Sequence, residues 1–298
     1  MTALRLGTRG SLLARTQSGL VADMITAATG YEVELVTIRS EGDDLTIPLD
    51  APKRPGAFVA TLRDALLSGE VDLAVHSAKD LPSAPVPGLT IAAFPPRADP
   101  RDAIYCPAGL GPHELPDGAR IGTSSPRRAK GLHRVRPDLQ IIPIRGNVDT
   151  RLAKADSGEV DASVLAAAGL ERLGYAGRIT AFIEPNLILP APAQGVLAVE
   201  CRTGELAGHL SVIDDLPTRL AAVAERSVLG GLEATCTTAI GALATWIDDT
   251  RLELHVEISE HRGINYARIS RTGVVTTQLE ATTLGATVCD ALLGDARQ

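Results

Sequence analysis

The chain has 298 residues, of which 45% are hydrophobic and 22% charged, so two or three domains with buried cores are expected. Its formal net charge of −7 and its aromatic content of only 3% argue against a nucleic-acid or anionic-membrane partner. The sequence shows no secretion signal, no membrane span of roughly 18–20 apolar residues and no C-x-x-C spacing, so we predict a cytoplasmic protein without a metal site.

The first hundred or so residues alternate strand-like and helix-like patterns, which is typical of a largely parallel sheet with helices on both faces. Ser11 is expected to cap the first helix and Gly30 to end it. The apolar face of this helix is predicted to comprise Leu13, Leu20, Val21, Met24 and Ile25. The other expected elements are the helix Phe58–Leu67 and the strands Leu4–Gly7, Val33–Ile38, Val71–Val75 and Leu89–Ala93.

Two Pro-rich stretches, Phe94–Pro100 and Leu189–Gly195, are typical of crossings between two lobes. The same alternation of strands and helices restarts between them. The elements expected there are the strands Ile121–Thr123, Leu139–Ile144 and Ala162–Leu165 and the helices Pro126–Val135, Val148–Ser157 and Ala166–Leu173. The strand Val196–Cys201 is expected to return the chain to the first lobe.

From about Pro217 the pattern changes to a long helix followed by β-rich segments. The expected elements are the helices Thr218–Leu229 and Ala286–Leu293 and the strands Ile240–Trp246, Leu252–Ile258 and Ala267–Ser270. We therefore predict an α/β fold with two doubly wound lobes, similar to those of periplasmic binding proteins, around a cleft, plus a small α+β C-terminal domain. The predicted domains are residues 1–95 with 196–214, residues 100–192, and residues 217–298.

Two polar segments of the first lobe follow strands, at the end where open α/β sheets bind ligands. Arg9 lies beside the start of a helix, where backbone N–H groups suit an anion. Lys79 offers a positive charge for a carboxylate, and Asp80 is a candidate general acid or base, or a stabiliser of a developing cation. A capped helix and a surface ion pair are the alternatives. His76 is expected to be structural, because no second ligand lies at metal-binding spacing.

The second lobe concentrates positive charge after its strands. Residues Ile121–Arg128 place three hydroxyl side chains before a proline at the first helical position, followed by Arg127 and Arg128. Further arginines follow later strands, at Arg145, Arg151 and Arg172. So many cations predict a site for a polyanion. Phosphates could satisfy the same charges, but the glycine patterns of nucleotide-binding loops are absent from the sequence.

Seven segments together resemble one family, hydroxymethylbilane synthase, also called porphobilinogen deaminase, of tetrapyrrole biosynthesis. In chain order they are GTRGSLLA, VHSAKDLP, ADPRDA, GTSSPRR, RGNVDTRL, LPAPAQG and the region of Cys236. One such segment would be a weak signal, but seven in the same order cover nearly the whole chain.

The resemblance implies an enzyme that joins four porphobilinogen units head to tail into hydroxymethylbilane and releases ammonia. Each unit brings an acetate and a propionate, which suits a site rich in arginine. Asp80 matches the family's catalytic carboxylate, which handles the pyrrole nitrogens and the cationic methylene-pyrrolenine intermediate. The implied substrate-binding residues are Arg9, Ser11, Ser77, Thr123, Ser124, Arg145, Arg151, Arg172 and Gln194.

Members of this family carry a dipyrromethane cofactor, joined by a thioether to a cysteine of the third domain, and Cys236 falls at that position. The implied cofactor contacts are Lys79, Asp80, Ser125, Arg127 and Arg128. The chain departs from the family pattern here, because Ala234 and Thr235 stand where Gly-Gly is usual, and Ala239 where Pro is usual. A β-branched Thr235 restricts the backbone where glycine would not.

The long polar segment Ser40–Gly56 is predicted to be a lid, with Phe58 at its hinge or over the pyrroles. A surface loop without a role is the alternative. Family members act as monomers, so a monomer is expected. Two other interpretations of the whole chain remain: a non-catalytic two-lobed anion-binding protein, or an inactive family member whose loop does not present the Cys236 thiol.

Overall fold

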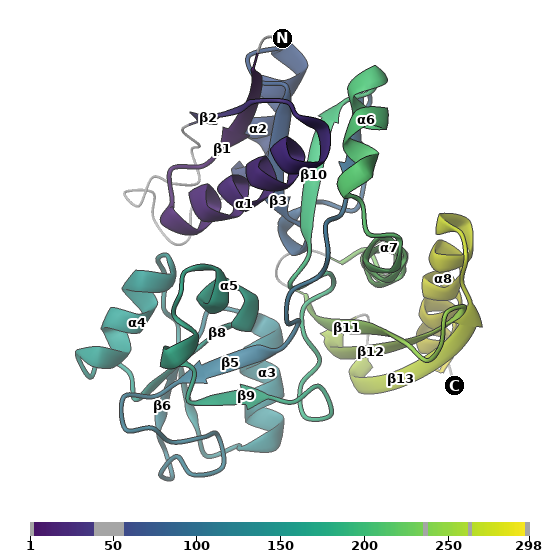
Figure 1. Ribbon diagram of the computed structural model, residues 1–298. Coiled ribbons are helices and arrows are strands. Elements are labelled where there is room, and N and C mark those ends of the chain that lie inside the picture. Colours follow the sequence, from purple (N-terminus) through teal and green to yellow (C-terminus); the bar gives the residue numbers. More distant parts are fainter. Residues whose placement is uncertain (1–2, 39–56, 235–237, 262–263, 296–298) are drawn as a thin grey trace. The chain divides into compact units, whose positions relative to one another are not determined.

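The computed structural model describes residues 3–38, 57–234, 238–261 and 264–295 (Figure 1). The chain divides into two compact units. The first comprises residues 1–97 and 196–219, and the second comprises residues 98–195 and 220–298. The boundary between residues 219 and 220 falls within a helix, α7 (Leu216–Gly231).

The first unit is built on a five-stranded sheet in the order β2-β1-β3-β10-β4. Its strands are β1 (Leu4–Thr8), β2 (Val33–Thr37), β3 (Leu73–Ser77), β4 (Leu89–Ala93) and β10 (Leu197–Arg202). Strands β1, β2 and β3 are parallel, whereas β10 runs antiparallel to both β3 and β4. Its helices are α1 (Leu12–Thr29), α2 (Ala57–Ser68) and α6 (Glu205–Leu210), with single 3-10 turns at η2 (Ala78–Asp80) and η4 (Ser211–Ile213).

Helices cover both faces of this sheet. Val21 and Ile25 of α1 pack with Leu73 of β3, whereas Leu66 of α2 packs with Ala74, the next residue, which points to the opposite face. The central strand β3 is therefore buried on both sides, as expected of a parallel sheet between helices.

Helix α1 confirms its predicted ends and corrects its predicted face. The Ser11 hydroxyl accepts a hydrogen bond from the Ala14 N–H, and Gly30 ends the helix in the left-handed conformation, with φ at 75°. Leu20 and Met24, expected in the core, are 40% and 38% exposed. The buried face is rotated about the helix axis relative to the predicted one, because only a narrow side of the helix meets the sheet. This face comprises Gln17, Ser18, Val21, Ala22 and Ile25.

The second unit contains a five-stranded sheet in the order β7-β6-β8-β5-β9. Its strands are β5 (Asp102–Tyr105), β6 (Arg120–Gly122), β7 (Gln140–Ile142), β8 (Ala162–Ala166) and β9 (Ala181–Ile183). The helices beside it are α3 (Pro126–Val135), α4 (Val148–Asp156) and α5 (Ala167–Arg172), with a 3-10 turn at η3 (Ala176–Arg178). Leu132 of α3 and Leu152 of α4 belong to different core clusters, on opposite faces of the sheet.

The two sheets have the same topology. In both, the fourth strand in spatial order, β10 or β5, runs antiparallel to its two neighbours. Strands β5 and β9 were not expected from the sequence. Both are short, and β5 begins two residues after Pro100, in a stretch whose composition indicates a loop.

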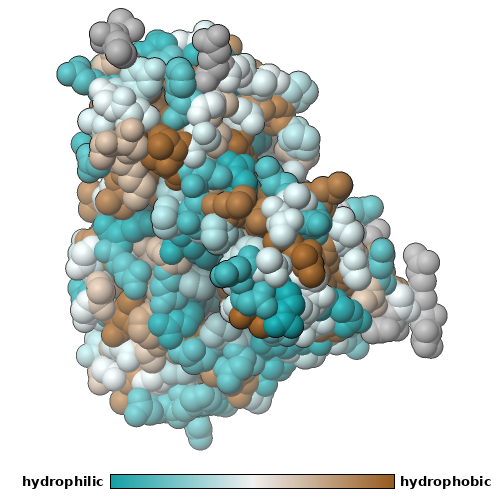
Figure 2. Space-filling model, turned by 45° about the vertical axis from the view of Figure 1, so that its right-hand side comes forward, coloured by the Kyte–Doolittle hydropathy of each residue, from teal (hydrophilic) through white to brown (hydrophobic). Residues whose placement is uncertain are grey.

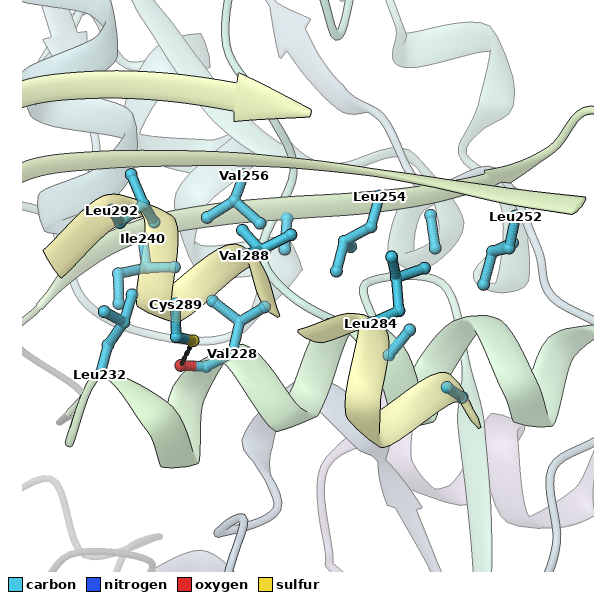
Figure 3. Packing of buried hydrophobic residues seen from close by; sticks show 14 of the residues in the cluster. Val228, Leu232, Ile240, Leu252, Leu254, Val256, Leu284, Val288, Cys289 and Leu292 are labelled. Carbon is cyan, nitrogen blue, oxygen red and sulfur yellow. Dashed lines mark hydrogen bonds between the residues drawn. The ribbon is translucent and has the colours of Figure 1, made fainter. Parts of the chain in front are cut away.

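The second unit also contains a three-stranded antiparallel sheet of β11 (Ala239–Trp246), β12 (Arg251–His261) and β13 (Ile264–Val274). Helices α7 and α8 (Gln278–Asp295) bury one face of it. Figure 3 shows this core, in which Val256 of β12 lies near Val288 of α8, and the Cys289 thiol donates to the Val228 carbonyl at 3.7 Å. The small α+β C-terminal part is thereby confirmed, as is the α/β class of the whole chain.

Large exposed hydrophobic side chains are distributed over many elements. On the face drawn in Figure 2, hydrophobic residues form several small groups among hydrophilic ones. No helix in the described part of the chain is long and apolar enough to cross a membrane.

Candidate active site

In the first unit, five predicted site residues lie beyond the carboxyl ends of neighbouring strands. Arg9 and Ser11 follow β1, and Ser77, Lys79 and Asp80 end or follow β3, which is parallel to β1. Parallel strands end at the same edge of a sheet, so the fold brings both segments to one edge.

Packing beneath this edge is tight. A Cβ on Gly7 of β1 would lie 3.1 Å from side-chain carbons of both Leu62 and Val71, so only glycine fits comfortably here. The Ser77 hydroxyl donates to Gln17 Oε1 at 3.4 Å, which ties the end of β3 to α1. The Ser11 hydroxyl is engaged as the helix cap, so its interaction in the structure is with the backbone.

Asp80 is the exposed carboxylate of this edge. It ends the 3-10 turn that Leu81 closes by donating its N–H to the Ala78 carbonyl. Within the part of the chain that the structure describes, the Asp80 side chain makes neither a hydrogen bond nor an ion pair. A carboxylate held on a short turn and left unpaired is available to a cationic ligand.

His76, expected to be structural, lies in β3, four residues before Asp80, and is buried. Its Nε2 is 3.1 Å from Glu200 Oε2, and Arg63 donates to the same carboxylate at 3.0 Å. Burial alone would raise the Glu200 pKa, but hydrogen bonds from His76 and Arg63 lower it overall. Their contacts form a buried ionic cluster between β3, β10 and α2.

In the second unit, the segment between β6 and α3 is ordered by its own hydroxyl groups. The Thr123 hydroxyl accepts from the Ser125 N–H at 3.2 Å, and the Ser124 hydroxyl donates to the Ile144 carbonyl at 2.7 Å. The Ser125 hydroxyl caps α3 by accepting from the Arg128 N–H, which was not predicted, and Pro126 occupies the first turn, as predicted. The hydroxyl side chains therefore fix the loop that carries the two arginines.

Arg127 and Arg128 converge on a carboxylate that was not selected from the sequence, Asp102. Arg127 Nη1 donates to Asp102 Oδ2 at 2.7 Å, and Arg128 donates to Oδ1 through Nε and Nη2, at 3.0 and 2.7 Å. The Asp102 side chain has no solvent exposure. Burial would raise its pKa, but the charges of Arg127 and Arg128 hold it far below its usual range. The ADPRDA segment contains Asp102, but nothing in the sequence indicates its partners.

Two more predicted arginines of this edge, Arg151 and Arg172, are partly buried. Arg151 Nε donates to the Gly146 carbonyl at 3.0 Å, and Arg172 Nη2 to the Gly195 carbonyl at 2.7 Å. Among the described residues, neither forms an ion pair. Burial, reinforced by Arg128, lowers the Arg151 pKa, and burial, against the opposing charge of Glu171, lowers that of Arg172 to about 10. Both shifts mean that the local environment disfavours the positive charge, which a bound anion would relieve.

Arg145 is exposed, between β7 and α4. Strands β6, β7 and β8 are parallel, so the residues that follow them share one edge. Asp102 reaches the same edge because it starts β5, which runs antiparallel to β8 and pairs Asp102 with Ala166. The second unit therefore brings together the remaining described site residues: Thr123, Ser124, Ser125, Arg127, Arg128, Arg145, Arg151, Arg172 and Gln194.

Gln194 is only 1% exposed and contacts protein groups. Its amide nitrogen donates to Asp102 Oδ1 at 2.9 Å and to the Pro100 carbonyl at 2.7 Å. The preceding Ala193 adopts φ of 60°, unusual for a residue other than glycine, and its N–H donates to Glu225 Oε2 at 2.5 Å. Residues 189–195 are thus held by the sheet on one side and by α7 on the other.

The C-terminal sheet docks on the same segment. The Ala242 N–H of β11 donates to the Pro190 carbonyl at 2.9 Å, and Arg127 donates to the Leu189 carbonyl at 2.6 Å. Gly241 lies against this backbone, since a Cβ there would be 2.8 Å from the Leu189 oxygen. Strand β11 begins three residues after Cys236, so this segment sets the start of β11 relative to the arginine pair.

Cys236 and the predicted lid, Ser40–Gly56, lie outside the described residues, as does the side chain of Phe58. The three described cysteines, Cys106, Cys201 and Cys289, are all buried. Burial raises the pKa of Cys201, and it raises that of Cys289 to about 11. These two thiols therefore stay protonated and poorly nucleophilic at neutral pH. Within the described ranges, no group of three or more His, Cys, Asp or Glu side chains could hold a metal ion.

Comparison with known proteins gives consistent results. Residues 4–208 match the family described as porphobilinogen deaminase, dipyromethane cofactor binding domain, and residues 219–294 match porphobilinogen deaminase, C-terminal domain. The porphobilinogen deaminase of Thermobifida fusca is 49% identical over 92% of this chain and 87% of that relative. That of Cutibacterium acnes is 54% identical over 82% and 77%, and that of Nocardia farcinica 48% identical over 98% and 86%.

Solved structures with a similar course of the chain include immunogenic lipoprotein A from Vibrio vulnificus. It is 15% identical, with a TM-score of 0.44, over 74% of this chain and 99% of that one. A periplasmic substrate-binding protein of an ABC transporter from Coxiella burnetii is 14% identical, with a TM-score of 0.43, over 75% and 96%.

Proposed function

This chain belongs to the porphobilinogen deaminase family, and from that premise we propose how its residues divide the work of the reaction. The enzyme joins four porphobilinogen units head to tail into hydroxymethylbilane. Each coupling breaks the bond between an aminomethyl carbon and its nitrogen, and forms a carbon–carbon bond to the next pyrrole. The nitrogen leaves as ammonia, and the ring carbon of the next pyrrole that forms the new bond loses its proton. Water supplies the hydroxyl group of the released product.

The arginines of the second unit bind the acetate and propionate groups. The observation that carries this proposal is the partial burial of Arg151 and Arg172 with no carboxylate partner among the described residues. Arg145 adds an exposed cation at the same edge, and Arg127 and Arg128 supply two positive charges against the single charge of Asp102. A growing oligopyrrole carries two carboxylates per unit, which suits this excess of positive charge.

Asp80 stabilises the positive charge that appears on the pyrrole as ammonia leaves. Its exposure and its lack of partners within the described ranges support this role, because a paired carboxylate would already be neutralised. Arg9, Ser11, Ser77 and Lys79 surround the same sheet edge and are proposed to bind substrate or cofactor carboxylates.

The cofactor is a dipyrromethane, which supplies the pyrrole on which the product is extended. The residues present fit such a group, because two partly buried arginines of the second unit require an anion to offset their charge. We propose Cys236 as the attachment site and Lys79, Asp80, Ser125, Arg127 and Arg128 as further contacts. The buried, protonated thiol of Cys289 supports the choice of Cys236.

We further propose that the chain acts as a cytoplasmic monomer with three domains: residues 1–95 with 196–214, residues 100–192, and residues 217–298. The lid function of Ser40–Gly56 with Phe58 is part of the same proposal. A non-catalytic anion-binding protein is not favoured, since the relatives that are about half identical over most of the chain are named porphobilinogen deaminases.

Intact-mass measurement of the purified chain tests the proposal. The mass should exceed that of the sequence by one dipyrromethane, and Cys236→Ser should lose both this excess and all turnover of porphobilinogen. Cys289→Ser is the matched control, because it changes a buried thiol of the same domain and should keep both. An unmodified mass, together with no consumption of porphobilinogen by the unmutated chain, contradicts the proposed function.

A further inference from the structure

We infer that Asp102 is a positioning residue for the reaction: it fixes the guanidinium groups of Arg127 and Arg128 in the orientation that binds pyrrole carboxylates, and Gln194 acts through it. This inference rests on the proposed function of the arginine edge. Gln194, predicted from the family resemblance to contact substrate, is thereby assigned an indirect role.

The geometry requires a fixed acceptor. Arg127 and Arg128 are consecutive on α3, so their side chains leave the helix about 100° apart. Asp102 nevertheless binds both, one through each carboxylate oxygen, and Nε and Nη2 of Arg128 both donate to Oδ1. Each arginine has a second anchor, since Arg127 donates to the Leu189 carbonyl and Arg128 to the Val164 carbonyl at 3.0 Å. Two long flexible side chains are thereby restricted to one arrangement.

The charges of this cluster do not cancel. The Asp102 carboxylate faces two guanidinium groups. Glu257, a buried carboxylate that also interacts with the charge of Arg127, forms ion pairs with two further arginines, Arg134 and Arg268, so positive charge stays in surplus. Arg128 is also close enough to Arg151 to lower its pKa. An ion pair whose purpose was stability alone would balance its charges, because buried net charge is costly. The surplus is what a carboxylate ligand at the end of α3 and α4 would neutralise.

Gln194 donates to the same oxygen of Asp102 as Arg128 does. Its amide group links Asp102 to the Pro100 carbonyl, and its 1% exposure leaves it no surface to offer a ligand. Asp102 therefore accepts four hydrogen bonds, three from the arginines and one from Gln194. Loss of any of these hydrogen bonds is expected to make the side chains of Arg127 and Arg128 less firmly held.

The test compares the full chain with its Asp102→Asn variant, well below the temperature at which either unfolds. Asn has the same shape but lacks the charge and has one acceptor oxygen in place of two. With that oxygen on Arg128 and Gln194, its NH2 group faces Arg127, so Arg127 loses its acceptor. We expect a lower fraction of molecules carrying the dipyrromethane mass. In the loaded fraction, the KM for porphobilinogen should rise roughly tenfold or more, with a smaller change in kcat.

Asp72→Asn is the matched control. Asp72 also bridges two arginines, accepting from Arg5 at 2.9 Å and from Arg202 at 3.1 Å, but it precedes β3 at the opposite end from Asp80. This variant should lower the unfolding temperature and leave cofactor loading and KM unchanged. If Asp102 had only a structural role, Asp102→Asn would likewise lower the unfolding temperature and leave cofactor loading and KM unchanged.

Gln194→Leu supplies the second measurement. It should raise KM by a smaller factor, and in the Asp102→Asn background it should add no further change, because both substitutions disturb one unit. Should Asp102→Asn fail to fold, a raised KM in Gln194→Leu supports the inference and an unchanged KM overturns it.

Normal loading and normal KM in folded Asp102→Asn also overturn the inference, while the proposed function stands. If the unmutated chain itself lacks the added mass and does not consume porphobilinogen, the proposed function fails, and the role of Asp102 fails with it.

Discussion

The two five-stranded sheets share one strand order but hold their acidic side chains differently at the edges where their parallel strands end. The edge of the first sheet presents Asp80, an exposed carboxylate on a short turn, near the segments of Arg9 and Lys79. At the edge of the second, the carboxylate of Asp102 is buried between Arg127 and Arg128. Strands of the same topology therefore lead to an exposed carboxylate without an ion pair among the described residues in one unit, and to a buried, doubly paired one in the other.

On the proposed division of roles, this difference suits two parts of the reaction. Substrate carboxylates are present throughout, which fits arginines fixed by a buried anchor. Positive charge on a pyrrole is transient, which fits a carboxylate that forms no ion pair with the described residues before the charge develops. Glu200, the buried acid of the first unit, lies in the middle of β10 and pairs with His76 and Arg63, away from the edge.

The largest effect is expected from Asp80→Ala. Removal of the carboxylate should lower turnover about a thousandfold, because the developing cation loses its counter-charge. Stability should change by no more than about 0.5 kcal/mol, since Asp80 is exposed. Steady-state kinetics and thermal unfolding measure the two quantities. Asp64→Ala, an exposed position on α2, is the control, and residual activity within tenfold of the unmutated level would remove Asp80 from its role.

A second substitution, Gly241→Ala, tests whether the C-terminal sheet is held in register with the arginine edge. The new Cβ would lie 2.7 Å from Leu189 Cβ and 2.8 Å from its oxygen. We expect a loss of about 2 kcal/mol in unfolding free energy and reduced cofactor loading, measured by urea denaturation and intact mass. Gly177→Ala, where a Cβ meets nothing within 4 Å, should leave both unchanged. Full cofactor loading in Gly241→Ala would show that loading does not depend on this contact.

Arg172→Gln sharpens the contrast between binding and stability. KM should rise about tenfold, whereas the unfolding free energy at neutral pH should increase by about 1 kcal/mol. The folded pKa, about 10, lies below the ordinary value for arginine, so charged Arg172 destabilises the fold at every pH below 10. That penalty fades as the pH rises from 10 towards the ordinary pKa of arginine. Urea denaturation near pH 7 measures it, and a less stable variant would contradict the expectation.

The smallest effect concerns Glu200→Gln. The folded pKa of Glu200 is lowered, so its stabilising contribution is present above its ordinary pKa of 4.5 and is lost as the pH falls through the folded value. The variant should be about 1 kcal/mol less stable at neutral pH, with the difference disappearing in acid, and its KM should stay normal. Unfolding temperatures across the acid range measure this, and a pH-independent difference would argue against the ionic cluster.

Local signals in the sequence were sufficient for much of the fold. The Ser11 cap, the end of α1 at Gly30 and the start of α3 at Pro126 were all predicted, because each depends on a hydrogen bond or a backbone angle within a few residues. The exposure of Leu20 and Met24 was not, since the orientation of a helix depends on the sheet beneath it.

The sequence by itself determined where the arginines and Asp80 stand relative to strand ends, and the resemblance of seven ordered segments determined the family. Only the tertiary structure placed Asp102 between Arg127 and Arg128, because β5 is an unpredicted antiparallel strand that brings a distant residue to the edge. It also placed Gln194 behind that carboxylate. Such contacts join residues far apart in the chain, and no local pattern specifies them.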